Sequence, residues 1–230
     1  MEKTFEKSYE KLISYVKEGI LAKRLEIGDK LPSERDLAAE LEISRNSVRE
    51  GIKILERIGV ISSHHGAGNY ITSQFDQTIT EVLSMMYVLK GMNTEEITEF
   101  RFGLEYAAIS LAVRKIDDNG KERLLHQLEA MESAETEAIR AKNDKIMHYL
   151  LVEFSENGYI ISTYNALNYI MEKYVPEMRE KIFIGMKTEE SLALAHRELI
   201  EGVVEGDEAK ALRGLFDHFR YIRQYMGNNC

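Results

Sequence analysis

Three histidines and one aspartate in the second half of the chain have the types and spacing of a metal site. Asp144 and His148 are four residues apart, so on a helix both side chains project from the same face. His196 and His218 fall on the last two predicted helices, and antiparallel neighbours joined by a short connection can bring two such positions level. One carboxylate and three imidazoles suit a divalent transition metal such as Zn or Ni. The alternative, from spacing alone, is a scatter of unrelated surface or core histidines.

Arginine and serine side chains near the start of the chain are spaced for contact with nucleic acid. Arg45, Arg49 and Lys53 recur at intervals of four along one side of a predicted helix. Ser33 and Ser44 each stand directly before an amphipathic run, which is the position of a helix N-cap. A basic helix of this kind can enter a DNA groove. The alternative for each arginine is a surface ion pair with a neighbouring carboxylate.

The segment 31–71 contains the elements that must position these side chains. A short helix is expected after Ser33, and a second helix after Ser44 that ends at Gly59, as a glycine just past the last apolar position indicates. Two short β-prone runs follow, joined by the glycine-rich turn 64–68. The sequence therefore predicts a helix-turn-helix with a small β-hairpin wing, an arrangement that suits entry into one DNA groove.

Beyond residue 75 the strand signals disappear and the apolar residues follow a helical period. The pattern predicts seven helices, over 78–90, 94–115, 119–135, 138–155, 158–183, 188–205 and 207–226. Pro176 predicts a kink inside the fifth of them. We therefore expect a mostly α-helical protein of two domains: a winged helix-turn-helix in residues 1–74, and an antiparallel all-α bundle of six to seven helices in residues 78–230.

Charge and composition narrow the class of protein. The chain has 230 residues and a net charge of −9. Residues 1–75 contain twelve basic and twelve acidic side chains, so the remaining residues hold eighteen of the 30 basic and twenty-seven of the 39 acidic ones. Because phosphate contacts depend on local charge, the acidic total does not exclude a DNA-binding face. The lack of a bilayer-length apolar run and the single cysteine, Cys230, lead us to expect a cytoplasmic protein without membrane contact.

Four separate sequence motifs resemble those of the winged helix-turn-helix in the GntR family of bacterial transcription regulators. They are Leu-Pro-Ser-Glu-Arg at 31–35, Ser-Arg-x-Ser-Val-Arg-Glu at 44–50, Leu-Glu-Arg-Ile-Gly-Val at 55–60 and Gly-Ala-Gly-x-Tyr-Ile at 66–71. The chain departs from the family at Ile27, Glu42 and Gly51, where Pro, Gly and Ala are usual. These departures bear on local turn geometry and helix propensity, not on DNA contacts.

The resemblance implies a double-stranded DNA operator as the partner. The arginines are expected to reach guanine edges or phosphates, the serines to bond phosphates through hydroxyls and helix N-termini, and the wing tip to contact the minor groove or phosphate. The residues expected at the DNA are Ser33, Arg35, Ser44, Arg45, Ser47, Arg49, His65 and Gly66. The alternative is that His65 only occupies a position in the turn and does not contact DNA. One such module reads too few bases for specificity, so a homodimer on a pseudo-palindromic operator is implied.

The second half resembles the FCD effector domain of the FadR subfamily within the same family. The pattern there is Asp-x-x-x-His, an asparagine-containing turn nine residues after that histidine, and single histidines on the last two helices. The matching residues are Asp144, His148, Asn157, His196 and His218. The resemblance implies a bound divalent metal, with the aspartate and the three histidines as its ligands and a small organic acid as effector.

The same resemblance implies how an effector is held. In FCD domains an arginine at the place of Arg101 points into the cavity, and a guanidinium that faces a metal can hold the other end of a carboxylate. The alternative is an intrahelical ion pair between Arg101 and Glu105. Asn157 and Tyr149 are also expected to contact the effector. Glu156 stands where the family usually has glycine.

These features predict a transcription repressor controlled by a small carboxylate at a metal site in the C-terminal domain. One alternative is a metal-sensing regulator, in which the ion itself is the signal. Another is a metalloenzyme, in which the four ligands activate a water molecule. That alternative lacks a general base in an evident motif and leaves the winged domain unexplained, so we expect no enzymatic activity.

Overall fold

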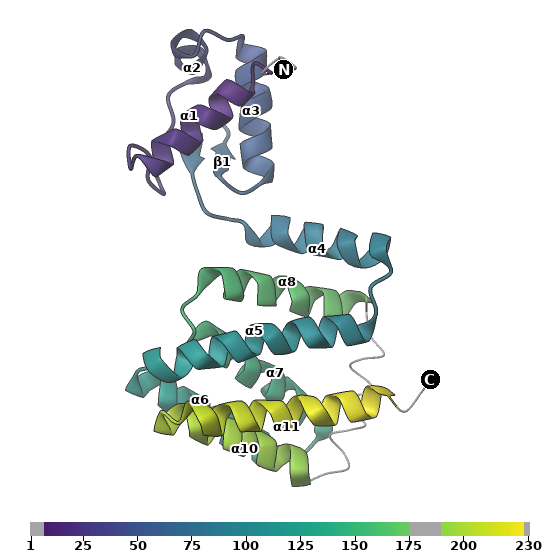
Figure 1. Cartoon of the computed structure of the whole chain (residues 1–230). Coiled ribbons are helices and arrows are strands. Elements are labelled where there is room, and N and C mark those ends of the chain that lie inside the picture. The colour runs from purple at the N-terminus through teal and green to yellow at the C-terminus, as the bar shows by residue number, and fades with distance from the viewer. Residues whose placement is uncertain (1–6, 175–189, 228–230) are drawn as a thin grey trace, which may run out of the picture. The chain divides into compact units, whose positions relative to one another are not determined.

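The structure, a computed structural model, describes residues 7–174 and 190–227 (Figure 1). The chain divides into two compact units, Met1–Ile79 and Thr80–Cys230. Each unit has its own hydrophobic core. Outside the described residues lie Cys230, Pro176 with its predicted kink, and the helix ends predicted between 175 and 189.

The N-terminal unit contains three helices and a two-stranded antiparallel sheet among its described residues. These are α1 (Glu10–Leu21), α2 (Glu34–Glu40), α3 (Arg45–Arg57), β1 (Ile61–His64) and β2 (Gly68–Ile71). Ile61 pairs with Ile71 and His64 with Gly68, so the hairpin tip lies between His64 and Gly68. This arrangement confirms the predicted helix-turn-helix with a hairpin wing.

Serine caps start the second and third helices, as the sequence predicts. Ser33 Oγ accepts a hydrogen bond from the backbone nitrogen of Asp36, and Ser44 Oγ accepts one from that of Ser47. Each bond satisfies one of the free backbone donors at a helix start. The buried apolar side chains of both helices then pack with those of α1 and the wing; the core consists of Leu12, Val16, Leu31, Leu37, Val48, Ile52, Leu55, Ile61 and Ile71.

Two departures from the GntR pattern have structural explanations. Glu42, in the turn between α2 and α3, has φ 53°, so it adopts the left-handed conformation that glycine adopts most easily. At Gly51 a Cβ would lie 2.9 Å from Leu12 Cδ2 and 3.2 Å from the carbonyl oxygen of Tyr9. The missing side chain therefore allows α1 to approach α3 closely, which offsets the weaker helix propensity of glycine.

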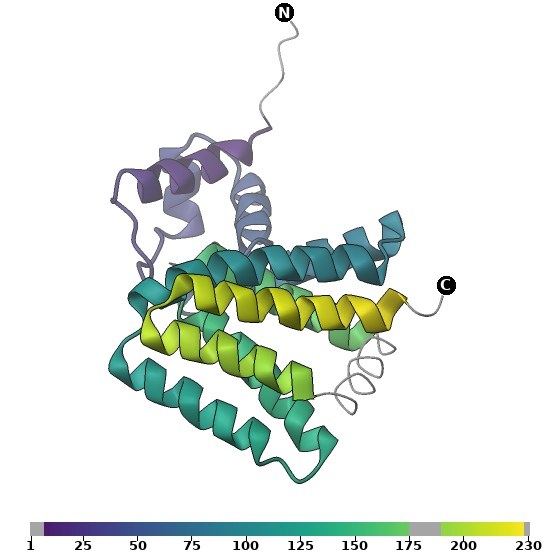
Figure 2. The ribbon, with the colours of Figure 1, turned by 60° about the horizontal axis from the view of Figure 1, so that its bottom comes forward.

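The C-terminal bundle is built from helices that pack side by side (Figures 1 and 2). The described helices are α4 (Asp76–Lys90), α5 (Thr94–Lys115), α6 (Asp118–Glu132), α7 (Glu137–Glu153), α8 (Gly158–Tyr174), α10 (Glu190–Glu205) and α11 (Glu208–Gly227). α10 and α11 are joined by a short turn and lie side by side, α5 packs against α7, α8 and α11, and α6 packs against α7 and α10. The mostly helical fold class is thereby confirmed.

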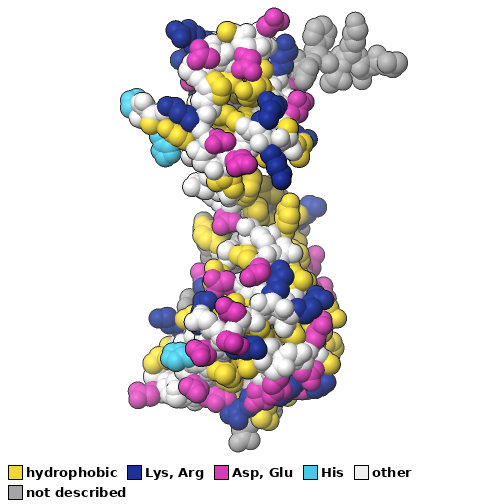
Figure 3. Space-filling model, turned by 90° about the vertical axis from the view of Figure 1, so that its left-hand side faces the viewer, with side chains coloured by type: hydrophobic (Ala, Val, Ile, Leu, Met, Phe, Trp, Pro, Cys, Tyr) yellow, Lys and Arg dark blue, Asp and Glu magenta, His cyan; other side chains and the backbone are white. Residues whose placement is uncertain are grey.

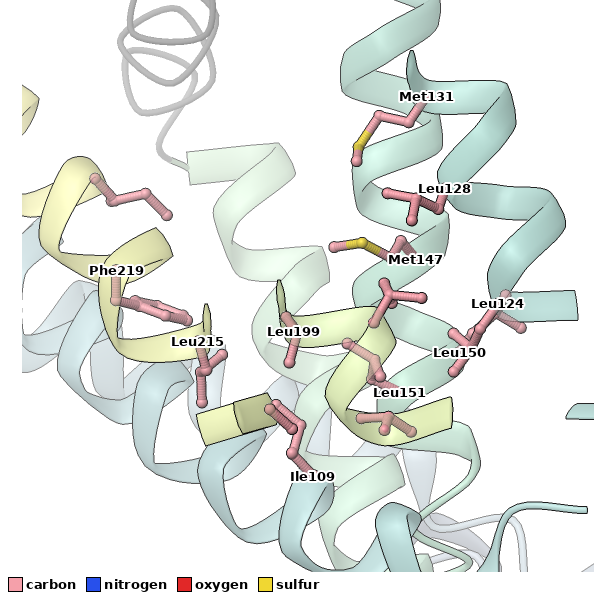
Figure 4. Close-up of a cluster of buried hydrophobic side chains, with 14 residues drawn as sticks. Ile109, Leu124, Leu128, Met131, Met147, Leu150, Leu151, Leu199, Leu215 and Phe219 are labelled. Carbon is pink, nitrogen blue, oxygen red and sulfur yellow. The ribbon is translucent and has the colours of Figure 1, made fainter. Parts of the chain in front are cut away.

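The largest core lies between α5, α6, α7, α10 and α11 (Figure 4). Leucine and methionine side chains from α6 and α7 meet Leu199 of α10 and Leu215 of α11, while Phe219 packs from the next turn of α11. Their burial holds the faces of α7, α10 and α11 together, and these are the helices that carry the candidate metal ligands. Among the described residues, no helix has the length and apolar character needed to cross a membrane.

Candidate functional site

The four predicted metal ligands meet inside the C-terminal bundle. Asp144 and His148 come from α7, His196 comes from α10, and His218 comes from α11. All four side chains are buried, with residue exposures of 9%, 0%, 2% and 2%. One ligand atom from each residue lies within 4.8 Å of those from the others. The tertiary structure therefore joins residues up to seventy-four positions apart into one cluster.

Glycines at the crossing of α10 and α11 bring the last two histidines together. A Cβ at Gly214 would lie 2.3 Å from the backbone nitrogen of Leu199, and a similarly close approach occurs at Gly202. The two helix backbones are therefore nearly in contact. His196 lies three residues before Leu199, and His218 lies four residues after Gly214. Because α10 and α11 run antiparallel, moving back along α10 to His196 and forward along α11 to His218 leads about one helical turn in the same direction in space. The two histidines are therefore level with each other.

The polar atoms of the cluster are aimed at one another without forming hydrogen bonds. His196 Nε2 is 2.9 Å and His148 Nε2 is 3.5 Å from the same oxygen, Asp144 Oδ1. Within the described part of the chain, no hydrogen-bond partner is found for these three atoms or for either ring nitrogen of His218. Buried polar atoms without partners are costly. A cation among them removes that cost, so the donor set fits a divalent metal.

The electrostatics of the cluster also favour a cation. Burial raises the pKa of the Asp144 carboxyl, but His148 and His196 outweigh it and hold that pKa well below the ordinary value. Burial lowers the pKa of His148, but Glu105 and Asp144 raise it to about 9. Burial, His148 and His196 together lower the pKa of His218 well below its ordinary value, which leaves that imidazole neutral. Ionised carboxylate and neutral imidazole are the forms that bind metals, so Asp144 and His218 are ready for a cation, whereas His148 must first lose a proton.

A buried carboxylate on α5 connects this cluster to the predicted effector arginine. Glu105 Oε2 lies 2.7 Å from His148 Nδ1, and Glu105 Oε1 accepts from Arg101 Nε at 2.6 Å and from the Tyr164 hydroxyl at 3.1 Å. Burial raises the pKa of Glu105, but Arg101 and His148 lower it below the ordinary value. The Arg101 guanidinium lies over the Phe219 ring, with its carbon 5.4 Å from the ring centre. The intrahelical pair expected from spacing is thus present and buried.

The predicted DNA contacts lie on the N-terminal unit. Ser33 and Ser44 occupy the starts of α2 and α3, and Arg35 and Arg45 are exposed there. On the face shown in Figure 3, basic and acidic side chains are interspersed over this unit. Arg49 is paired with Glu34, its Nε 2.7 Å from the carboxylate oxygen.

The other predicted contacts lie close to these residues or at the wing. Ser47 is half-buried, with its hydroxyl 2.9 Å from that of Ser44. His65 and Gly66 are exposed at the hairpin tip, where Gly66 has φ 75°. The serines and arginines therefore cluster at two helix starts and one helix face.

Family comparison decides the identity of the two units. Residues 8–71 match the model for bacterial regulatory proteins of the gntR family, and residues 96–221 match the model for the FCD domain. The chain belongs to the GntR family. It combines the N-terminal helix-turn-helix with a C-terminal FCD domain, as in FadR-like regulators. This GntR-family protein is therefore a transcription regulator.

Known relatives cover most of this GntR-family chain. The "Putative L-lactate dehydrogenase operon regulatory protein" of Escherichia coli is 27% identical over 208 residues, covering 89% of this chain and 80% of the relative. The transcriptional regulator LutR of Bacillus subtilis is 26% identical over 204 residues, covering 88% and 93%. The solved structure of Streptococcus agalactiae GntR shares the fold, with a TM-score of 0.63 at 21% identity and coverage of 94% and 97%. The homologues are transcription regulators and not enzymes.

The remaining effector residues expected for this GntR-family regulator have separate structural roles. Asn157 caps α8, because its side-chain oxygen accepts from the backbone nitrogens of Tyr159 and Ile160 at 3.1 and 3.3 Å. Tyr149 follows His148 on α7 and is 37% exposed, unlike the buried ligand before it. The sequence indicates Glu105 only as an ion-pair partner of Arg101, because the two residues are four positions apart on one helix. No sequence pattern indicates the contact of Glu105 with His148 or with Tyr164.

Proposed function

We propose that this GntR-family regulator is a repressor controlled by a small carboxylate effector that binds at a metal in the FCD domain. The observation that carries the proposal is the buried cluster of four ligand atoms within 4.8 Å, whose polar atoms lack hydrogen-bond partners among the described residues. The mixed imidazole and carboxylate donors suit Zn or Ni. A metal held by Asp144, His148, His196 and His218 would supply a Lewis-acidic centre for one end of an organic acid.

The location of Arg101 supports a carboxylate as the ligand class. Its guanidinium is buried beside the cluster, tied through Glu105 to the ligand His148. Arg101 Nε donates to Glu105, and the guanidinium offers five N–H donors in a planar fork. Such a group matches the geometry of a carboxylate. We propose that an organic acid bridges the metal and Arg101, with Tyr149 and Asn157 as more peripheral contacts.

The metal content of two matched variants tests the ligand set. We expect purified wild-type protein to contain a stoichiometric transition metal by elemental analysis, and His148→Ala to lose it. His126→Ala is the control, because His126 is exposed on α6, away from the cluster. Undiminished metal in His148→Ala would show that the ligand assignment is wrong.

The second partner in this proposal is a pseudo-palindromic DNA operator, which a homodimer binds with one winged domain on each half-site. The exposed Arg45 at the start of α3 is suited to reach a base edge. Arg45→Ala should cost roughly 1–3 kcal/mol of discrimination at its base pair. Fluorescence anisotropy on operator variants measures this cost, and unchanged selectivity would refute the contact.

Organic acids are the effector class to screen on metal-loaded protein. The Escherichia coli relative is named for the L-lactate dehydrogenase operon, so L-lactate and other hydroxy acids are the first candidates. A ligand that binds only the folded protein raises its melting temperature. It should also change operator affinity, because effector control requires unequal affinity for two states of the protein. Identical operator affinity with every acid that binds would count against effector control.

A metal-sensing regulator is the second candidate. Four protein donors can close a tetrahedral shell by themselves, as in structural zinc sites, with no place left for an organic acid. In that case chelation and metal addition alone switch operator affinity. Anisotropy titrations with and without a chelator, in the absence of organic acids, separate this candidate from the first.

A further inference from the structure

Glu105 serves two groups with its two carboxylate oxygens. It lies on α5 and is 1% exposed. Oε2 faces His148 Nδ1 at 2.7 Å, whereas Oε1 receives Arg101 Nε at 2.6 Å and the Tyr164 hydroxyl at 3.1 Å. These contacts connect α5 with α7 and α8 through one side chain.

The donors around Glu105 define which atom of His148 carries hydrogen. The Arg101 guanidinium can only donate, and an ionised carboxylate can only accept. The His148 Nδ1 that faces the same carboxylate must therefore be the N–H donor of the pair. In a neutral imidazole the lone pair then resides on Nε2. That nitrogen lies 3.5 Å from Asp144 Oδ1, within the cluster of ligand atoms.

We propose that Glu105 is a positioning residue that fixes His148 as an Nε2 metal ligand and, through its other oxygen, holds Arg101 beside the same metal. This inference rests on the metal centre proposed above. A carboxylate behind a ligating histidine sets the ring orientation and raises the basicity of the ligand. Because one side chain contacts both groups, loss of its charge weakens metal binding and effector binding together.

The variant Glu105→Gln tests this role with little change in shape. A glutamine offers one acceptor oxygen and one donating amide, so it cannot accept from His148 and from Arg101 on separate oxygens. We expect the zinc affinity, measured by competition with a chelator, to fall about 10–100-fold, as when a partner behind a metal ligand is removed. Unchanged zinc affinity would overturn the proposal.

Tyr164→Phe is the matched control. It removes one donor from Glu105 but leaves the contact of this carboxylate with His148, so wild-type zinc affinity is expected. Metal-free melting temperatures of both variants measure any general loss of stability. A similar loss of zinc affinity in Tyr164→Phe would assign the effect to disturbed packing and overturn the specific role of Glu105.

The tautomer of His148 provides a readout that needs no variant at Glu105. Long-range 1H–15N correlation spectra of the zinc-loaded full chain should show Nδ1 of His148 protonated and Nε2 metal-bound. The His148 resonances are assigned in metal-free protein by their absence from His148→Ala and are followed through a zinc titration. Metal bound to Nδ1 of His148 would overturn the proposed role of Glu105 but not the metal centre itself. A wild-type chain that binds no zinc would instead overturn the metal centre, so the two failures are distinguishable.

Discussion

At the scale of single residues, the surroundings hold two of the predicted ligands, Asp144 and His218, in the form that binds a metal. Burial removes the charged form of His218, while neighbouring imidazoles keep Asp144 ionised despite its burial. His148 is the exception, because Glu105 and Asp144 raise its pKa to about 9 against the lowering effect of burial. In metal-free protein near neutral pH, a proton on His148 therefore occupies the place of the cation.

Zinc affinity should consequently depend on pH. Below pH 9 the metal must displace the His148 proton, so affinity should rise about tenfold per pH unit between pH 6 and 8 and level off as the proton is lost. Calorimetry in buffers of different ionisation enthalpy measures the proton released. A pH-independent affinity with no proton release would contradict this expectation.

On the DNA-binding unit, Glu34 holds Arg49 in an ion pair in which both side chains remain partly exposed. Pairs of this kind contribute about 0–1 kcal/mol to stability. Glu34→Gln should therefore leave the free energy of unfolding almost unchanged. It should raise affinity for non-specific DNA and reduce discrimination, because the positive charge of Arg49 is no longer oriented or offset.

Anisotropy on operator and scrambled duplexes measures both effects. Glu40→Gln, at an exposed acid on the same helix α2, is the control for the loss of one negative charge. If the two variants behave alike, the Glu34–Arg49 pair has no role in discrimination.

At the scale of elements, glycines determine how closely helices approach. Gly202 and Gly214 let α10 and α11 pack backbone to backbone, and this crossing sets His196 level with His218. A glycine inside a helix costs roughly 0.5–1 kcal/mol relative to alanine. The close packing of this helix pair and the alignment of two ligands offset that cost.

Gly214→Ala should therefore be destabilising, although alanine favours helix. The new Cβ would lie 2.3 Å from the backbone of Leu199, so α10 and α11 must separate, at about 1–3 kcal/mol. Zinc affinity should fall with it. Gly103→Ala on α5 is the control: its Cβ would meet nothing within 4 Å, and it should gain about 0.5–1 kcal/mol. Chemical denaturation and chelator competition measure the two quantities, and equal stability of the two variants would refute the packing argument.

Three described residues other than glycine have a left-handed backbone, Lys23, Glu42 and Glu156. Glu42 has φ 53° and Glu156 has φ 50°, at the two positions where related sequences usually have glycine. Left-handed backbone costs about 1–2 kcal/mol for such residues, whereas glycine loses about 0.5–1 kcal/mol more chain entropy on folding. Glu42→Gly should thus stabilise the protein by up to about 1 kcal/mol, while Glu40→Gly at the end of α2 should destabilise it. Urea titrations of both variants test the contrast.

At the scale of the whole molecule, the chain has two compact units with separate cores, and the helix-turn-helix and the candidate metal site lie in different units. The candidate metal site lies entirely within the C-terminal bundle, on α7, α10 and α11. Zinc addition to the full metal-free chain should slow hydrogen exchange most in these three helices, since binding stabilises the native bundle. Uniform protection of α1–α3 at the same zinc concentration would show instead that the ion acts on both units.

Local patterns in the sequence determined most of the elements. The caps at Ser33 and Ser44 and the helical period beyond residue 75 depend on neighbours within one or two turns, so they are readable along the chain. Helix ends were less exact: α6 ends at Glu132, three residues before its predicted end. The spacing of the aspartate and the histidines left both metal ligands and scattered histidines open, and only the family resemblance favoured the ligands.

What only the tertiary structure decided depends on residues far apart in the chain. The approach of α10 to α11 at Gly214 and the triple contact of Glu105 with His148, Arg101 and Tyr164 have no local signature. Hydrophobic burial selects which helix faces meet, and the size of the side chains between them sets how closely. Which polar side chains meet between two helices depends on both the choice of the packed faces and the distance between them. Spacing and family resemblance along the chain therefore indicated the candidate metal ligands, whereas packing determined which side chains contact them.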